Sequence, residues 1–201
     1  YARLLAGYFK ERYQDLGGEI TMEAFVNDSD LESLSRAIGD EGPDMIYLAA
    51  GPEEAEAMVE AMRKAGIDSP VFGGDSLDSP ELSRDGMGRI VFSTHALLDE
   101  NSTSTGEFVR AYQAEYGYPP ENAFSALGYD TVNLLAEAID RAGSGDPQAI
   151  LDALGNTSGF KGVTGEISYQ SGGRIPNKDV TMVWLTDGEI ASNNGGWQWS
   201  A

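Results

Sequence analysis

The chain of 201 residues is long enough for one large domain or two small ones, and its 41% hydrophobic content is enough to bury a core. Its 33 acidic and 13 basic residues give a formal net charge of -20, and such a field repels nucleic-acid phosphates and anionic lipid, so both are poor partners. The chain contains no cysteine, which excludes disulfides, thiolate metal sites and cysteine nucleophiles.

The acidic residues are spread along the chain, which indicates a solvated surface and not an acidic interaction tail. A saline habitat is one explanation for this composition. No apolar run approaches the ~20 residues of a membrane span, and no basic-then-apolar leader is present. The chain opens at helical spacing without an initiator Met, as a processed or truncated protein would, so Tyr1 is not taken as the native start.

The first elements in chain order are a helix and a strand. Apolar residues recur at helical spacing over residues 4–16, and Gly17-Gly18 provides the stop. Apolar and polar residues alternate in EITMEAF, residues 19–25, which predicts a strand. Ser29 to Glu32 then fit a capping box that opens the next helix.

Two further strand and helix pairs follow. The apolar run DMIYLAA, residues 44–50, predicts a strand, and Gly51-Pro52 predicts the helix start after it. PVFGG, residues 70–74, predicts a third strand, and Ser79-Pro80 predicts the N-cap and first position of a short helix. This alternation is typical of a parallel, doubly wound sheet, in which ligands bind off the carboxyl ends of the strands.

The second half of the chain is mainly helical. A capping box at Ser104 and Glu107 predicts a helix through Tyr116, and further helices are predicted over residues 123–143 and 147–154. Two strands are predicted in the tail, in GVTGEISYQ and in DVTMVWLTDGE, with Asp187-Gly188 as a turn. The three helices need a sheet to cover their apolar faces. Either they form their own bundle or their sheet is missing from this chain.

Asp75 is the first candidate for a functional residue. An Asp before a helix is commonly an N-cap, but Ser79 directly before Pro80 is the better cap, which leaves Asp75 for another role. Asp75 follows Gly73-Gly74 at a strand end, where glycines let a ligand approach closely. A carboxylate there suits an ammonium or amide donor. Helix capping and ligand binding stand as the two alternatives.

The other motifs favour no catalytic centre, metal site or cofactor. His95 is the only histidine and lies in an apolar run without a nucleophile elbow elsewhere, so a structural or hinge-region role is favoured. The acidic cluster over residues 27–30 lacks the spacing of a calcium loop, and the glycine pairs are isolated turn signals. Trp197 and Trp199 are expected to pack on their own domain.

Several segments stand in an order that is typical of one family. They are YARLLAGYF, DMIYLAA, GIDSPVFGGD, GRIVFSTHAL and FVRAYQAEYGYPPENAFSALGYDTVNLLAEAIDRAGSGD, then GVTGEISYQSGG and TDGE; GYD at 128–130 and GVTG at 162–165 are the most telling. Over essentially its whole length the chain resembles the branched-chain amino acid (Leu/Ile/Val) binding proteins of ABC importers. The resemblance implies an α/β, periplasmic-binding-protein-like type I fold, with a Rossmann-like parallel-sheet lobe plus helices and strands of a second, incomplete lobe.

The same resemblance implies a division of the chain into three segments. Residues 1–92 would form the ligand-binding α/β lobe, the family's second lobe. Residues 93–160 would form a crossover and the helices of the first lobe, and residues 161–201 the hinge return strands and C-terminal tail. An N-terminal segment with most of the first lobe, and with the Ser/Thr residues that grip the ligand carboxylate, would be absent. The apolar helix faces left exposed would favour self-association of the chain.

The resemblance also implies three ligand-binding residues. Tyr1 falls where the family has a ligand-contacting Tyr, and Asp75 falls where it has an acidic residue that takes the ligand's α-amino group. The turn at Ala50 and Gly51 occupies a third contact region, where some relatives have an aromatic residue. Glycine at this position would leave a roomier pocket.

The function implied is that of a non-enzymatic receptor. It would bind a small amino acid or amide-like solute between two lobes by hinge closure and present it to the membrane permease of an ABC importer. Its location would be periplasmic or extracellular, with a lipid anchor in a Gram-positive source. A ligand-sensing domain of a signalling receptor or amide-responsive regulator is the alternative. An enzyme with Asp75 as general base would lack a second convergent catalytic group.

Overall fold

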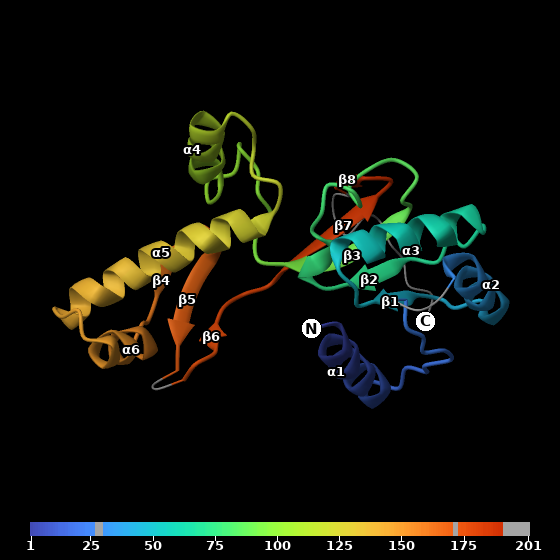
Figure 1. The fold of residues 1–201 in the computed structure, drawn as a ribbon, viewed down its shortest axis with the longest axis horizontal. Helices are drawn as coiled ribbons and strands as arrows, with labels where there is room; N and C mark the ends of the chain where they lie inside the picture. Colours follow the sequence, from blue (N-terminus) through green and yellow to red (C-terminus); the bar gives the residue numbers. More distant parts are fainter. Residues whose placement is uncertain (27–29, 171–172, 191–201) are drawn as a thin grey trace. The chain divides into compact units, whose positions relative to one another are not determined.

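The computed structural model describes residues 1–26, 30–170 and 173–190 (Figure 1). By their contacts the residues form two compact units. Unit 1 combines residues 1–93 with the chain from Met182 onward, and unit 2 comprises Thr94–Thr181. Trp197, Trp199 and Ser29, all considered above, lie outside the described residues.

Unit 1 is built on one sheet with the strand order β1-β2-β3-β7-β8. Its strands are β1 (Ile46–Leu48), β2 (Val71–Gly73), β3 (Arg89–Thr94), β7 (Thr181–Thr186) and β8 (Glu189–Ile190). The first three strands run parallel, and in their register Leu48 pairs with Gly73 and Gly73 pairs with Phe92. The predicted parallel arrangement is therefore confirmed for β1, β2 and β3, whereas β7 and β8 pair antiparallel and make the sheet mixed.

The helices of unit 1 are α1 (Ala2–Asp15), α2 (Leu31–Glu41), α3 (Pro52–Lys64) and the short 3-10 helix η1 (Asp75–Leu77). α3 starts as predicted, with Gly51 at the N-cap and Pro52 in the first turn, where its missing N–H costs no hydrogen bond. Its inner face packs on the sheet to form the core, with contributions from Leu48, Ala55, Met58, Val59, Met62, Val71, Leu77, Leu82, Met87, Ile90, Phe92, Val183 and Leu185.

Two predicted elements of unit 1 are wrong. Residues 19–25 form no strand, because a strand needs a neighbour with which to pair; Lys10 instead binds Glu23 at 2.5 Å, and the Arg3 guanidinium lies 5.0 Å from the Phe25 ring centroid. The residues after Ser79 form successive turns and no helix, since the Leu82 N–H binds the Ser79 carbonyl at 3.2 Å. These turns bury Leu82 and Met87 before β3 begins.

Asp30 caps α2. Its carboxylate accepts hydrogen bonds from the Glu32 N–H at 3.1 Å and the Ser33 hydroxyl at 2.8 Å. Asp187 and Gly188 form the predicted turn between β7 and β8, with φ of 47° and 79°. Both residues have the left-handed backbone conformation that a two-residue hairpin turn of this type requires.

Unit 2 contains three helices and a small antiparallel sheet of order β4-β5-β6 among its described residues. Its elements are α4 (Gly106–Tyr116), α5 (Ala123–Ala142), α6 (Pro147–Gly155), β4 (Phe160–Gly162), β5 (Gly165–Tyr169) and β6 (Pro176–Asn177). The three predicted helices are confirmed; β4 and β6 were not predicted. Asn122 caps α5, Asp146 caps α6, and Gly143 ends α5 with φ of 58°.

The predicted capping box at Ser104 and Glu107 is wrong. The N-cap of α4 is Thr105, one residue later, and it makes no side-chain cap bond. Its hydroxyl accepts a hydrogen bond from the Asp99 N–H at 3.1 Å and faces the Leu97 carbonyl at 3.3 Å. Thr105 thus fastens the loop that precedes α4 instead of capping the helix.

Asp130 is the polar centre of unit 2. It is 2% exposed, and its carboxylate accepts hydrogen bonds from the Val163 N–H at 2.7 Å, the Thr164 N–H at 2.8 Å and the Thr164 hydroxyl at 2.7 Å. A Cβ on Gly162 would lie 2.5 Å from an Asp130 carboxylate oxygen. The GYD and GVTG motifs therefore contact each other, and the small size of Gly162 permits the contact.

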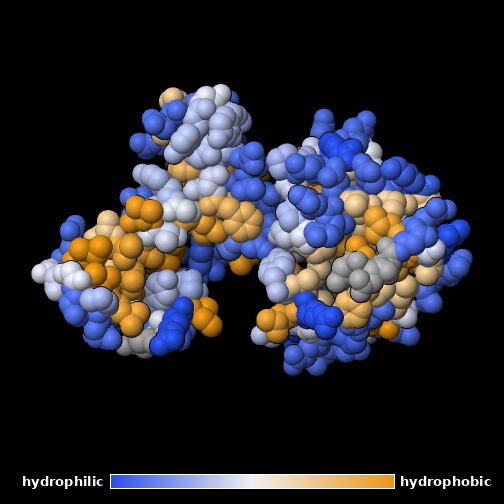
Figure 2. All heavy atoms as spheres, viewed as in Figure 1, coloured by the Kyte–Doolittle hydropathy of each residue, from blue (hydrophilic) through white to orange (hydrophobic). Residues whose placement is uncertain are grey.

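α5 is apolar on two opposite faces. One face carries Ala126, Asp130, Leu134 and Ala138 and is buried. The other, here called the open face, contains no charged residue and comprises Ser125, Gly128, Tyr129, Val132, Leu135, Ala136 and Ile139. Val132 is 67% exposed. Figure 2 shows hydrophobic residues gathered over the part of unit 2 where Figure 1 places α5 and α6. The described helices of unit 2 do not close into a bundle that covers this face.

Candidate functional site

The carboxyl ends of β1 and β2 lie at the same edge of the sheet in unit 1. Leu48 and Gly73, the last residues of these strands, are register partners. The turn over Ala49 to Gly51 follows one strand, and Gly74 with Asp75 follows the other. In parallel sheets this edge is where ligands bind.

Tyr1 and Asp75 meet at this edge. The Tyr1 hydroxyl donates a hydrogen bond to a carboxylate oxygen of Asp75 at 2.5 Å, across 74 positions of sequence. Tyr1 is the N-cap residue of α1, and its side chain is 64% exposed. The start of α1 therefore brings a phenol to the end of β2.

The two glycines before Asp75 are explained by close packing. A Cβ on Gly73 would lie 2.3 Å from Leu77 and 2.8 Å from the Leu48 carbonyl oxygen. A Cβ on Gly74 would lie 2.7 Å from the Tyr1 hydroxyl. Any larger residue at 74 would push Tyr1 away from Asp75.

The Tyr1 phenol is partly shielded from solvent. Burial raises the pKa of the Tyr1 phenol, and its hydrogen bond to Asp75 raises it further, while Ser76 acts in the lowering direction. The Ser76 hydroxyl oxygen is buried close to this phenol. Ser76 was not predicted as a site residue, because a serine after Asp75 reads as ordinary turn chemistry.

Tyr47 of β1 is a second residue that sequence reasoning missed. Its ring stacks on Phe9 of α1 with the centroids 3.8 Å apart and the planes at 5°. Burial raises its pKa to about 12, and the nearby Tyr1 and Asp75 add to the shift. A tyrosine within an apolar strand is normally predicted to be a core residue. The one feature of the sequence that could have indicated a site was its hydroxyl in an otherwise apolar run.

This pKa gives an alkaline titration that can be tested. Because the folded pKa lies above the ordinary 10.0, neutral Tyr47 stabilises unit 1 below pH 10, and this stabilisation is lost as the pH rises through about 12. The difference in phenolate absorbance between wild type and Tyr47→Phe should have its midpoint near pH 12. Tyr8→Phe, at an exposed position, is the control. A midpoint near pH 10 with native circular dichroism would contradict the buried environment.

Gly51 lies at the same edge, after β1, where it is the N-cap of α3. A Cβ there would lie 2.5 Å from a Glu54 carboxylate oxygen, which is the far end of a flexible side chain. The structure thus brings Tyr1 and Asp75 into direct contact and places Gly51 at the adjacent strand end.

No group of three or more potential metal ligands occurs in the described part of the chain. His95 follows β3, and its ring packs edge-on against Phe124 with the centroids 5.9 Å apart. No helix within the described ranges is long and apolar enough to cross a membrane.

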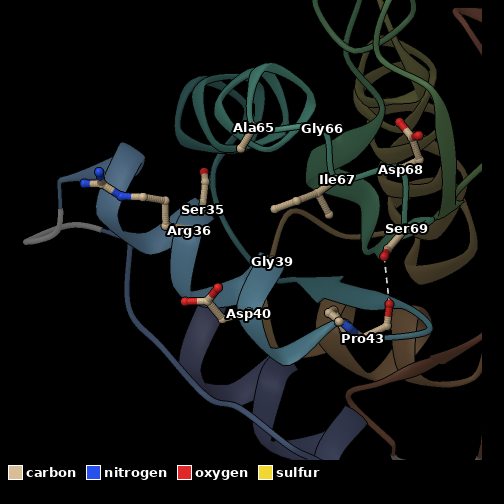
Figure 3. Close-up of a pocket in the computed structure, with 11 residues that line it drawn as sticks. Ser35, Arg36, Gly39, Asp40, Pro43, Ala65, Gly66, Ile67, Asp68 and Ser69 are labelled. Carbon is tan, nitrogen blue, oxygen red and sulfur yellow. Dashed lines mark hydrogen bonds between the residues drawn. The ribbon is translucent and has the colours of Figure 1, made fainter.

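A separate hollow lies at the opposite edge of the sheet, before β1 and β2 (Figure 3). Its volume is about 510 Å³, and it is lined by Ser35, Arg36, Gly39, Asp40, Gly42, Pro43, Ala65, Gly66, Ile67, Asp68 and Ser69. The Ser69 hydroxyl donates to the Pro43 carbonyl at 2.7 Å and joins the two loops. Because it lies at the amino ends of the strands, this hollow is not the edge at which parallel sheets bind ligands.

The side chains at the carboxyl edge suit a cationic group. A carboxylate next to phenol and serine hydroxyls can accept hydrogen bonds from an ammonium group and orient it. The fold is that of an α/β periplasmic binding protein of type I. The chain belongs to the family described as periplasmic binding protein, whose sequence profile matches residues 1–189. This is a family of binding proteins, as predicted, and not of enzymes.

Named relatives agree with this membership. The Leu/Ile/Val-binding protein homolog 1 of Brucella abortus is 28% identical over 177 residues, which cover 86% of this chain and 47% of the relative. The crystal structure of leucine-binding protein LivK from Thermotoga maritima superposes with a TM-score of 0.80 at 28% identity, covering 92% of this chain and 54% of that one.

A third relative is the branched-chain amino acid transporter substrate-binding protein LivJ of Streptococcus pneumoniae, solved with isoleucine. It is 29% identical to this chain and has a TM-score of 0.78. The match covers 93% of this chain and 54% of that one. The chain therefore spans about half the length of the relatives it matches. The predicted family and the type I fold class are confirmed.

Proposed function

We propose that the chain is part of the solute-binding component of an ABC importer for branched-chain amino acids or similar small solutes. The contact between Tyr1 and Asp75 at the carboxyl edge of the sheet carries this proposal, because it holds a carboxylate in place for a cationic group. The names of the relatives from Brucella abortus and Streptococcus pneumoniae support the class of solute. Family membership supports a periplasmic or extracellular location.

In this proposal Asp75 accepts the α-ammonium group of the solute and the Tyr1 hydroxyl fixes the carboxylate. Gly51 has no side chain of its own at the neighbouring strand end, and the space beside it is taken by the carboxylate of Glu54, a flexible side chain that can move aside. The solute is held between two lobes that close about the chain connections near residues 94 and 181, and the closed form is presented to a membrane permease. Residues 1–92 act as one lobe, which β7 and β8 complete, and residues 93–160 supply helices of the other, to which β5 and β6 also belong. Within residues 161–201 the chain returns through the hinge near residue 180.

The name of the Streptococcus pneumoniae relative, a transporter substrate-binding protein, supports the importer over the sensor alternative. A transmembrane or output domain encoded in the same gene would select the sensor instead.

Asp75→Asn is expected to weaken binding of L-leucine or L-isoleucine to the complete gene product by about thirtyfold, or about 2 kcal/mol. Asn keeps the shape but loses the charge that strengthens a hydrogen bond to ammonium. Titration calorimetry measures the change, and the melting temperature shows whether unit 1 stays folded. Asp85→Asn, an exposed change in the same unit, is the control. An unchanged affinity in Asp75→Asn would remove Asp75 from the site.

A further inference from the structure

The chain passes between the two units twice. It leaves the sheet of unit 1 at the end of β3 and enters unit 2 at Thr94 and His95. It returns through Lys178 and Asp179 into β7, which begins at Thr181. β3 and β7 are hydrogen-bonded neighbours in the sheet. The two connections are therefore fastened together on the side of unit 1.

Lys178 fastens the same two connections on the side of unit 2. Its ammonium group donates to the His95 carbonyl at 2.9 Å and to the Thr164 carbonyl, and it lies 3.5 Å from the Asp179 carbonyl. An ammonium has three N–H donors, and these three carbonyls come from the outgoing connection, the β4–β5 turn and the returning connection. One side chain thus joins both connections to a common point.

The β4–β5 turn that Lys178 contacts is itself hydrogen-bonded to α5. Thr164, whose carbonyl accepts from Lys178, also gives its N–H and its hydroxyl to Asp130 at 2.8 and 2.7 Å. Asp130 belongs to α5, the longest helix of unit 2. A continuous path of hydrogen bonds therefore runs from α5 through Thr164 to Lys178 and His95.

The pKa of Lys178 agrees with an ammonium group that is partly shielded from water. Burial lowers the pKa of Lys178, while the charges of Asp130 and Asp179 oppose the shift. Hydrogen bonds in such surroundings are stronger than at the surface, and an unsatisfied carbonyl there is costly.

We propose that Lys178 is a positioning residue that makes the two connections between the units move as one. With both connections fastened at both ends, the units bend about a single axis. Without the ammonium, each connection moves independently and the units also twist. This role differs from ordinary stabilisation of unit 2, because it depends on the bond to His95 in the outgoing connection.

Hydrogen exchange of the 201-residue chain tests the local part of this proposal. In Lys178→Met, which keeps the length of the side chain and removes its donors, exchange at residues 95–97 and 179–181 should rise about tenfold or more, while β1, β2 and α3 keep their protection. Lys178→Arg, which retains donors, should restore part of the protection. Lys161→Met is the control, because Lys161 is an exposed lysine of the same unit, paired with Glu166.

A distance measurement tests the consequence for motion. The chain has no cysteine, so Glu53→Cys in α3 and Gln148→Cys in α6 introduce the only two labelling sites. The distribution of distances between spin labels at these sites should broaden in Lys178→Met and remain as in wild type in Lys161→Met. Neither measurement uses a ligand, so the result is independent of whether the proposed solute binding is correct.

Two results would overturn the proposal. The first is wild-type protection at residues 95–97 together with an unchanged distance distribution in Lys178→Met. The second is a uniform loss of protection throughout unit 2 in both Lys178→Met and Lys178→Arg, which would make Lys178 a stabilising residue only.

Discussion

Asp130→Ala is expected to lower the free energy of unfolding of unit 2 by about 3 kcal/mol or more. The change removes the acceptor for the N–H groups of Val163 and Thr164 and for the Thr164 hydroxyl, in surroundings that leave Asp130 only 2% exposed. Buried donors without an acceptor lose their hydration without replacement, so the cost exceeds that of a surface bond.

The two units can be followed separately during this unfolding. Trp184 lies in β7 of unit 1, and in a Trp197→Phe, Trp199→Phe background it is the sole tryptophan. Urea unfolding followed by circular dichroism should therefore show an early transition of unit 2 that tryptophan fluorescence does not share. Asp140→Ala, an exposed change in the same helix, is the control. A loss below about 1 kcal/mol would show that Asp130 is not the centre of unit 2.

Gly162→Ala provides a coupled test of the same contact. Its Cβ would lie 2.5 Å from Asp130, so it should be destabilising on its own. Combined with Asp130→Ala, it should cost clearly less than the sum of the two single changes, because the clash then has no partner.

The 201-residue chain is expected to self-associate through the open face of α5. This face has no charged residue, and Tyr129, Val132, Leu135 and Ile139 are exposed on it. A helix that is apolar on two opposite faces needs a partner on each. The net charge of -20 opposes association, so added salt should strengthen it.

Val132→Lys combined with Leu135→Lys should weaken this association by more than about a hundredfold, because an interface would then bury unpaired ammonium groups. Sedimentation velocity over a range of protein concentrations measures the effect. Asn133→Lys with Gln148→Lys adds the same charge at exposed positions outside the open face and is the control. A wild-type chain that is strictly monomeric and melts cooperatively would contradict the prediction.

Sequence reasoning succeeded where the signals are local. Pro52 at a helix start, Gly143 at a helix end and the Asp187-Gly188 turn each act through their own backbone, so periodicity and turn chemistry located α3, α5 and the β7–β8 hairpin. Residues 19–25 alternate like a strand, but strand formation depends on a distant neighbour that the alternation does not reveal.

The site was only partly predictable for the same reason. Asp75 was singled out by its glycines, and the family resemblance added Tyr1 and Gly51. The contact of Tyr1 with Asp75 spans 74 positions and needed the structure. Tyr47 reads as core until Phe9 is seen stacked on it. Lys178 gave no signal at all, because its partners are backbone carbonyls, which any residue provides.

The place of β7 beside β3 sets the order in which the protein can fold. Unit 1 completes its sheet only after residues 95–180 have been synthesised, so its closure is a late, non-local event. Unit 2 is contiguous and can fold first. Once it has done so, Lys178 already holds His95 nearby, and the loop that must close to pair β7 with β3 is short. We expect unit 1 to refold faster when unit 2 has already folded.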